Sequence, residues 1–145
     1  MEKTTVIAVV GCGRIANNAH FPAFAKMENL RIKYACDLIL SKAEAVKEKY
    51  PMVENVITDY KVALADPEVE AVYVLTTNTA HYTVTMDALA AGKHVFCEKP
   101  VAVAYKYAEE MAAAAEKYGK ILNIGVCNRF QRSVVELEQL NREGK

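Results

Sequence analysis

Residues 6–16 read VIAVVGCGRIA, an apolar run that passes directly into a turn with two glycines. The turn matches the pattern G-x-G-x-x-G/A, which joins a buried strand to a helix in dinucleotide-binding α/β sheets. Gly11 permits the tight turn, Gly13 lets the backbone approach a pyrophosphate, and Ala16 lets the helix pack closely on the strand. The amino end of that helix attracts phosphate charge. The residues of this turn predicted to contact a cofactor are Gly11, Gly13, Arg14 and Ile15.

An acidic residue follows the second strand-like run. Residues 32–36 are followed by Asp37, about 20 residues beyond the glycine turn, where an acid can accept hydrogen bonds from the adenosine ribose hydroxyls. Asp37 would repel a 2′-phosphate, so NAD is the predicted cofactor. Lys42 lies close enough in sequence to offset that charge, so use of NADP stays open.

A second informative stretch is GKHVFCEKP at residues 92–100. Residues 95–97 suit a short central strand, so Glu98, Lys99 and Pro100 should emerge at its carboxyl end, where open α/β sheets bind their ligands. An isolated lysine is usually an ordinary surface charge. The glycine turn in the same chain favours the other interpretation, in which Lys99 acts on a ligand.

Polar residues also follow the strand that ends near Val74. Thr76 and Asn78 could bond the ribose or the nicotinamide amide of a cofactor, although Asn78 or Thr79 could equally cap the next helix. His81 falls in the first turn of that helix. It could face the cleft, cap the helix or point to solvent.

The rest of the chain alternates strand-like and helix-like segments. Residues 41–50 look helical, with Ser41 as N-cap and Glu44 as its capping-box partner, and Ser133 with Glu136 would open the last helix in the same way. Further strands are expected at 56–57, 71–75 and 120–125, and further helices at 60–65, 79–91 and 104–118. This order predicts an α/β fold with a Rossmann-type, doubly wound parallel sheet.

Glycine and proline mark the limits of several helices. Gly92 and Gly119 follow predicted helices, as left-handed C-caps favour. Pro22 should break or restart the first helix near Phe21, because proline lacks an N–H and clashes with the preceding turn.

Composition limits the class of protein. The chain has 145 residues, 52% of them apolar, and a formal net charge of zero. No linker or repeat divides it, so residues 1–145 are predicted to form a single domain. Without a basic run, nucleic acid and membrane surfaces are poor partners. Residues 1–5 do not resemble a secretory signal and no apolar stretch could span a bilayer, so a cytoplasmic location is predicted.

The four cysteines occur singly in or beside strand-like runs, without a CxxC pair. We therefore expect neither a metal site nor a disulfide framework. Cys12, Cys36, Cys97 and Cys127 are all predicted to be small buried hydrophobic residues.

Taken together, these motifs resemble a known family. It is the glucose-fructose oxidoreductase, inositol dehydrogenase and rhizopine-catabolism (Gfo/Idh/MocA) family of NAD(P)-dependent oxidoreductases, and the resemblance covers nearly the whole chain. The residues that carry it, in order, are Gly11 to Ala16, His20, Pro22, Asp37, Thr76, Asn78, His81, and Glu98-Lys99-Pro100.

The resemblance implies roles for the Glu-Lys-Pro residues. Lys99 would be the catalytic residue beside the nicotinamide and the substrate, Glu98 a cofactor-side contact, and the bond before Pro100 a cis peptide. One departure is Thr77, where the family usually has proline, and this bears on loop rigidity more than on chemistry.

The implied reaction is hydride transfer between a nicotinamide cofactor and a secondary alcohol or ketone of a sugar or cyclitol, with Lys99 holding or relaying the hydroxyl proton. Asn128 and Arg129, after the last strand, could touch substrate or cofactor. Arg129 could instead pair with an acid of the final helix.

Family members continue into a C-terminal α/β domain that supplies the polyol substrate pocket and the usual subunit interface. We expect that domain to be absent from residues 1–145, so the chain should bind the dinucleotide but turn over polyols poorly by itself, and its assembly into a homo-oligomer stays open. Two other classes of protein are compatible with some of these features. A non-catalytic NAD(P)-binding or redox-sensing module would need no substrate domain. An S-adenosylmethionine-dependent methyltransferase shares the glycine turn and the following acid, but it usually has an acid before the glycines, where this chain has Val9 and Val10.

Overall fold

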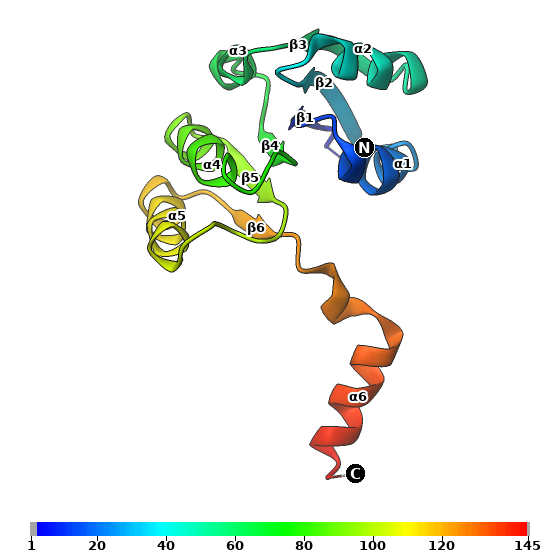
Figure 1. The fold of residues 1–145 in the computed structure, drawn as a ribbon, viewed down its shortest axis with the longest axis vertical. Coiled ribbons are helices and arrows are strands. Elements are labelled where there is room, and N and C mark those ends of the chain that lie inside the picture. The colour runs from blue at the N-terminus through cyan, green and yellow to red at the C-terminus, as the bar shows by residue number, and fades with distance from the viewer. Residues whose placement is uncertain (1–2, 145) are drawn as a thin grey trace.

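The computed structural model describes residues 3–144, so the first two residues of the amino-terminal segment considered above lie outside it. Its centre is one sheet of six parallel strands in the order β3-β2-β1-β4-β5-β6 (Figure 1). The strands are β1 (Thr5–Val10), β2 (Leu30–Cys36), β3 (Val53–Ile57), β4 (Ala71–Val74), β5 (His94–Cys97) and β6 (Leu122–Ile124). From β1 the chain adds β2 and β3 on one side, and it then adds β4, β5 and β6 on the other side. This strand order is that of the dinucleotide-binding fold. The predicted α/β, doubly wound parallel sheet is confirmed.

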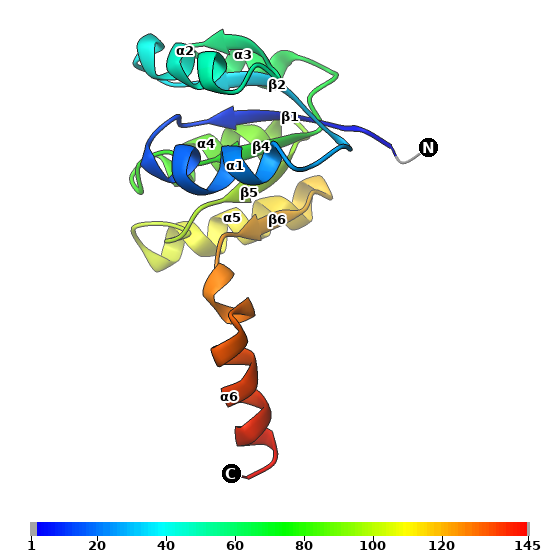
Figure 2. The same ribbon diagram turned by 90° about the vertical axis from the view of Figure 1, so that its right-hand side faces the viewer.

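Helices cover both faces of the sheet (Figures 1 and 2). Alternation along β1 explains how: Ile7 and Val9 belong to one buried cluster, and Ala8 and Val10 belong to the other. The first cluster includes residues of α1 (Phe21–Phe24) and α2 (Leu40–Lys49), and the second includes residues of α3 (Tyr60–Ala65), α4 (His81–Ala90) and α5 (Tyr105–Tyr118). Strands buried on both faces are continuously apolar, which is why residues 6–10 are so uniform.

Both predicted capping boxes are wrong. Helix α2 follows Ile39 and α6 (Arg132–Arg142) follows Gln131, and neither cap position has a side-chain hydrogen bond, so Ser41 and Ser133 lie inside their helices. At α2 the reason is the preceding acid. Asp37 Oδ1 accepts a hydrogen bond of 3.0 Å from the N–H of Ile39, which turns the chain into the helix before Ser41 is reached.

Pro22 restarts the first helix as predicted, but the chain does not break. A π-helical turn, η1 (Ala16–His20), precedes α1, and the N–H of Phe21 donates to the carbonyl of Ala16, five residues back. Pro22 then occupies the first turn of α1, where a missing N–H costs little. The wider turn therefore carries the helix past the proline and shifts the direction of the side chains before it, including His20.

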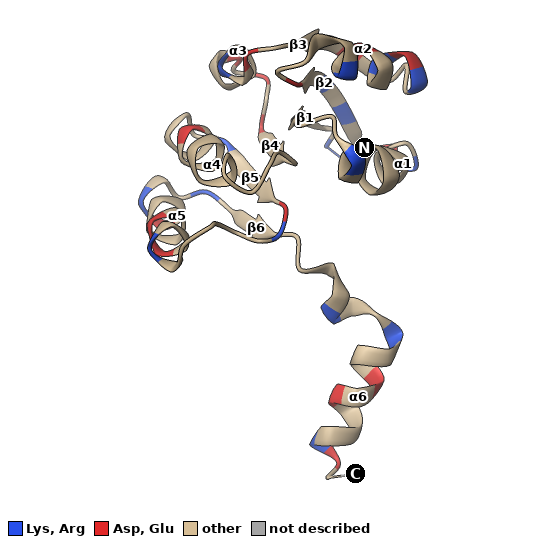
Figure 3. Cartoon of the chain, viewed as in Figure 1, with Lys and Arg blue, Asp and Glu red and all other residues tan. Residues whose placement is uncertain are grey.

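The last segment stands apart from the sheet. After β6, η2 (Cys127–Phe130) and α6 project away from the body of the molecule, and every described residue from 126 onward is exposed (Figures 1 and 2). A basic residue lies at each end of α6 and two acidic residues lie between them (Figure 3), and two i,i+4 ion pairs join Arg132 to Glu136 and Arg142 to Glu138. Within residues 3–144, no helix is long and apolar enough to cross a membrane.

The left-handed glycines are as predicted. Gly92 has φ of 76° after α4, and Gly119 has φ of 61° at the end of α5.

Candidate dinucleotide site

The glycine turn lies against the end of β4. Gly11 has φ of 103°, and a Cβ at this position would stand 2.5 Å from the carbonyl oxygen of Leu75. Only glycine fits there, because both the backbone conformation and the neighbouring strand exclude a side chain. Gly13 differs: apart from its own neighbours along the chain, no atom of the described residues lies within 4 Å of the position its Cβ would take. A side chain at Gly13 would enter open space in front of the turn, where a ligand's phosphates would approach the backbone.

Two cavities flank this turn and share Arg14, Ile15 and Thr76 in their walls. The first, here the Lys99 cavity, has a volume of about 400 Å³ and is also lined by Asn18, Asn78, His81, Glu98 and Lys99. The second, here the Asp37 cavity, has a volume of about 530 Å³ and includes Gly11, Gly13, Asp37, Leu38, Ile39 and Lys42. Each volume lies in the range of roughly 300–1,000 Å³ typical of ligand sites. Their shared wall is the glycine turn, so one elongated ligand could occupy both.

Asp37 is held at the wall of its cavity by two backbone amides. Oδ2 accepts a hydrogen bond of 3.0 Å from the N–H of Cys12, and Oδ1 accepts from the N–H of Ile39. The carboxylate is therefore oriented before any ligand arrives, with lone pairs left for ribose hydroxyls. Burial, followed by the charge of Asp37, raises the pKa of the Cys12 thiol to about 12, so this cysteine stays neutral beside the turn.

Apolar residues next to Asp37 complete this wall. Leu38 is 90% exposed, and Ile39 is also exposed, although both line the cavity. Sequence reasoning did not single them out. Their position directly after the acid was the available signal, because adenine needs an apolar surface close to the ribose site.

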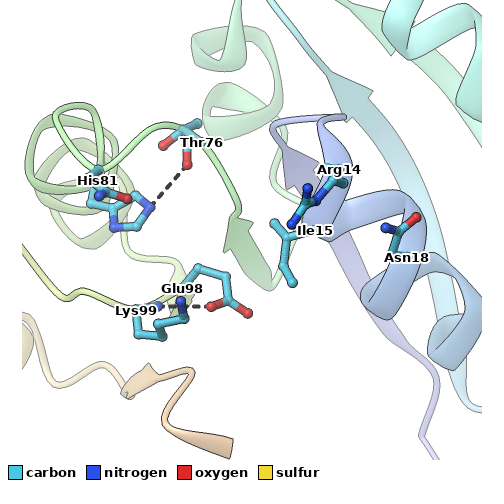
Figure 4. Close-up of a pocket in the computed structure, with 8 residues that line it drawn as sticks. Arg14, Ile15, Asn18, Thr76, His81, Glu98 and Lys99 are labelled. Carbon is cyan, nitrogen blue, oxygen red and sulfur yellow. Dashed lines mark hydrogen bonds between the residues drawn. The ribbon is translucent and has the colours of Figure 1, made fainter.

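The loop after β5 forms the floor of the Lys99 cavity. The N–H of Glu98 donates to the carbonyl of Val74 at 3.0 Å, which brings this loop beside the end of β4. Lys99 is exposed, and its backbone N–H donates to Glu98 Oε2 at 3.0 Å (Figure 4). The bond between Lys99 and Pro100 is cis, as the resemblance implied. Figure 4 shows Arg14, Ile15 and Asn18 on the opposite side of the cavity.

His81 is buried and joins two loops. Its Nδ1 lies 2.7 Å from the carbonyl oxygen of Pro100, and its Nε2 lies 3.2 Å from that of Thr76 (Figure 4). Both carbonyl oxygens are acceptors, so a ring nitrogen donates to the oxygen that it faces when that nitrogen carries a proton. The ring thus ties the Lys99 loop to the end of β4 while one edge lines the cavity. The alternatives of a helix cap or a solvent-facing position are wrong.

The predicted cap of α4 is also wrong. Ala80 occupies the cap position without a side-chain hydrogen bond, so neither Asn78 nor Thr79 caps this helix. The N–H of Ala80 instead bonds the carbonyl of Thr77 at 2.9 Å in a tight turn. This turn leaves Asn78 facing the Lys99 cavity.

Two asparagines of the first helix have functions that the sequence did not reveal. Asn17 donates from Nδ2 to the carbonyls of Cys12 and Gly13, at 2.9 and 3.0 Å, and so braces the glycine turn. Asn18 lines the Lys99 cavity. The spacing of Asn17, four residues after Gly13, was the signal for the brace.

The structure does not bring Asn128 and Arg129 to the site, because η2 leads away from the sheet and neither residue lines the Lys99 cavity or the Asp37 cavity. Asn128 Oδ1 accepts from Gln131 at 3.2 Å. The Arg129 guanidinium lies 5.7 Å from the ring centre of Phe130, and within residues 3–144 it makes no ion pair with an acid of α6.

The cysteine prediction holds for three of the four residues. Cys12, Cys36 and Cys97 are buried, whereas Cys127 is exposed because it begins η2 rather than ending a strand. In the described part of the chain, no group of histidine, cysteine or acidic side chains is arranged to hold a metal ion.

Three features define a dinucleotide-binding Rossmann domain. They are the parallel strand order 3-2-1-4-5-6, a glycine turn after β1, where the strand order switches sides, and an acid at the end of β2. Comparison with known proteins agrees. The family described as "Oxidoreductase family, NAD-binding Rossmann fold" matches residues 5–126. The chain belongs to this family, and the methyltransferase alternative is therefore set aside.

Among its relatives, a D-glucoside 3-dehydrogenase of Escherichia coli is 35% identical over 92% of the chain and 38% of its own length. An inositol 2-dehydrogenase of Salmonella typhimurium is 31% identical over 98% of the chain and 43% of its own length. Among solved structures, the WlbA dehydrogenase of Chromobacterium violaceum in complex with NADH and UDP-GlcNAcA superimposes with a TM-score of 0.91 at 30% identity, covering 98% of this chain and 41% of that one. The chain thus spans about two fifths of the length of these proteins.

Proposed function

We propose that this chain is the cofactor-binding part of an NAD-dependent enzyme that oxidises a secondary alcohol of a sugar or cyclitol, or reduces the corresponding ketone. One observation carries the proposal: Lys99 stands at the carboxyl end of β5 in a cavity that shares its wall with the glycine turn and the Asp37 cavity. This position would let the Lys99 amine transfer a proton beside a bound dinucleotide. The glucoside and inositol dehydrogenases among the relatives support the substrate class.

The residues present fit the cofactor. The uncrowded Cβ position of Gly13 leaves the backbone of the turn accessible to a pyrophosphate, and the pre-oriented carboxylate of Asp37 suits the adenosine ribose. The nicotinamide half would lie in the Lys99 cavity, where Thr76 and Asn78 offer polar contacts. Asp37 favours NAD over NADP, and Lys42 in the same cavity is the residue through which NADP could still be accepted.

A bound nicotinamide supplies the hydride chemistry. The chain's own contribution is to hold the proton: Lys99 Nζ accepts it from the substrate hydroxyl in oxidation and returns it in reduction. Lys99 is exposed, so the substrate would approach from the open side of the cavity. The remaining length of a longer polypeptide, of the kind seen in the relatives, would enclose that side and bind the polyol. Assembly into a homo-oligomer and a cytoplasmic location stay predictions.

Calorimetric and thermal-unfolding titrations of the purified chain with NADH, NADPH and S-adenosylmethionine test the proposal. NADH at a hundredfold excess over its Kd should stabilise the fold by about 2.7 kcal/mol, and S-adenosylmethionine should not stabilise it. Lys99→Ala should retain NADH binding, because the lysine is placed for proton transfer rather than for the pyrophosphate or adenosine contacts.

The assay of turnover separates the other outcomes. The chain alone should reduce NAD with a panel of polyols slowly or not at all. Steady reduction abolished by Lys99→Ala would show that no further domain is required. Absence of binding by either nicotinamide cofactor would refute the proposal.

A further inference from the structure

Among the described residues, the side chain of Lys99 has no hydrogen bond or ion pair that would fix its position. The position of the amine therefore depends on how neighbouring residues hold the Lys99 backbone. The neighbour with the most defined geometry is Glu98. One of its carboxylate oxygens accepts from the Lys99 N–H at 3.0 Å, and the other lies 2.9 Å from Nε2 of His20. His20 comes from η1, 78 residues earlier in the chain. Glu98 therefore links the first crossover helix to the peptide that carries Lys99.

The contact between His20 and Glu98 is enclosed. Each side chain is only 13% exposed, so water competes weakly for the hydrogen bond. The His20 ring lies among three aromatic rings, with centroids 5.3 Å from Phe96, 5.9 Å from Phe24 and 6.1 Å from Tyr73. These rings hold the imidazole in place. Nε2 can donate to the Glu98 carboxylate both in the neutral tautomer that is protonated at Nε2 and in the imidazolium ion.

A third part of the chain also lies close to this carboxylate. Gly125, just after β6, is so close that a Cβ on it would stand 3.2 Å from the carboxyl carbon and Oε1 of Glu98. The side chain of Glu98 thus packs beside Gly125 as well as beside His20. Neither His20 nor Gly125 lines the Lys99 cavity, whereas Glu98 does.

From this geometry we propose that His20 is a positioning residue for the nicotinamide end of the site: it holds the Glu98 carboxylate in the wall of the cavity and away from the amine of Lys99. Without the His20 donor, Glu98 would be free to form an ion pair with the adjacent lysine, which would draw both groups out of position. The inference rests on the proposed function, because it assigns Glu98 and Lys99 to the nicotinamide end.

Calorimetry with two ligands tests it. NADH and ADP-ribose share the adenosine, the pyrophosphate and the second ribose, so the ratio of their Kd values reports the nicotinamide end. His20→Phe keeps the aromatic packing but removes the donor. We expect it to weaken NADH about tenfold while ADP-ribose changes less than about twofold, as for loss of a hydrogen bond to a charged group. His20→Gln, whose amide nitrogen can occupy the place of Nε2, should restore the ratio.

A matched control and a double variant sharpen the result. His94 lies at the amino end of β5, away from the carboxyl ends of the strands, and its Nδ1 accepts from the N–H of Ile121 at 3.0 Å. His94→Gln should leave the ratio unchanged. If His20 acts through Glu98, His20→Phe should add nothing in a Glu98→Ala background. Should His20→Phe fail to fold, His20→Asn takes its place, since its amide stops one methylene short of the Nε2 position.

Three results in the variants would overturn the inference. Unchanged Kd values of both ligands in His20→Phe would show that Glu98 needs no support. An equal loss of both ligands would mean that His20 supports the fold in general. A loss that His20→Gln does not restore would assign the effect to the ring itself. If the unaltered chain binds ADP-ribose but NADH no more tightly, the proposed nicotinamide site fails, and this inference fails with it.

Discussion

Gly11→Ala should lower the stability of the fold, whereas Gly13→Ala should weaken NADH binding, although the two glycines lie two residues apart in one turn. At Gly11 the backbone has φ of 103°, and the new Cβ would stand 2.5 Å from a carbonyl oxygen of Leu75. At Gly13 no positive φ is required, and within residues 3–144 the new Cβ would meet no atom within 4 Å beyond its own chain neighbours. The first substitution therefore acts on folding and the second on binding.

The magnitudes follow from the geometry. The unfavourable φ of an alanine at position 11 costs about 1–3 kcal/mol. The new Cβ would also overlap the backbone of Leu75, just after β4, and shifting that backbone costs about 1–3 kcal/mol more. Gly11→Ala should thus lower the free energy of unfolding by about 2–6 kcal/mol, a large part of the total stability of a domain of this size. Gly13→Ala should change it by less than about 0.5 kcal/mol, as for other uncrowded surface sites.

Urea unfolding followed by circular dichroism measures the first effect, and calorimetry with NADH measures the second. With a slope of about 2 kcal/mol/M, a loss of 4 kcal/mol lowers the midpoint of Gly11→Ala by about 2 M. Gly13→Ala should keep the midpoint of the unaltered chain but bind NADH at least about tenfold more weakly, because its methyl group occupies the approach to the pyrophosphate. Equal destabilisation by both variants, or normal NADH binding by Gly13→Ala, would refute the reasoning.

Three further predictions concern the remaining charges and thiols. Asp37→Ser should shift cofactor preference from NADH towards NADPH in the same calorimetric assay, and unchanged selectivity would remove Asp37 from the ribose site. A hydrogen bond from Lys33 is the main cause that holds the pKa of Asp66 at about 2, below its value of about 3.9 in an unfolded chain. The stabilisation from Asp66 is therefore present above about pH 4 and lost as the pH falls towards 2. Urea unfolding between these pH values should show a flatter pH dependence in Asp66→Asn, and an unaltered slope would contradict the assignment. In the folded chain a thiol reagent should modify Cys127 alone, because the other three cysteines are buried and burial raises their thiol pKa values; modification of a second thiol before unfolding would contradict the packing.

The sequence by itself determined the class of fold and the two ends of the site. Continuous apolar runs such as residues 6–10 identify strands buried on both faces, and glycines at 11 and 13 identify the turn that follows. These signals are local: each depends on residues within one strand and its adjoining turn. For the same reason the positions of Asp37 and Lys99 at strand ends could be predicted, since a residue that follows a parallel strand lies at the carboxyl edge wherever the strand falls in the sheet.

Only the tertiary structure decided which of these residues meet. The strand order places β4 beside β1, and that pairing creates the close approach of Gly11 to Leu75. The contact between His20 and Glu98 also depends on the π-helical turn, a local register change that the pattern around Pro22 did not reveal. Similar reasons explain the failures. Ser41 and Ser133 fit a capping pattern, but helix starts are set by competing turns, such as the one Asp37 makes with Ile39. His20 and Glu98 are 78 residues apart, and their contact depends on how the sheet assembles, so the spacing along the chain does not predict it.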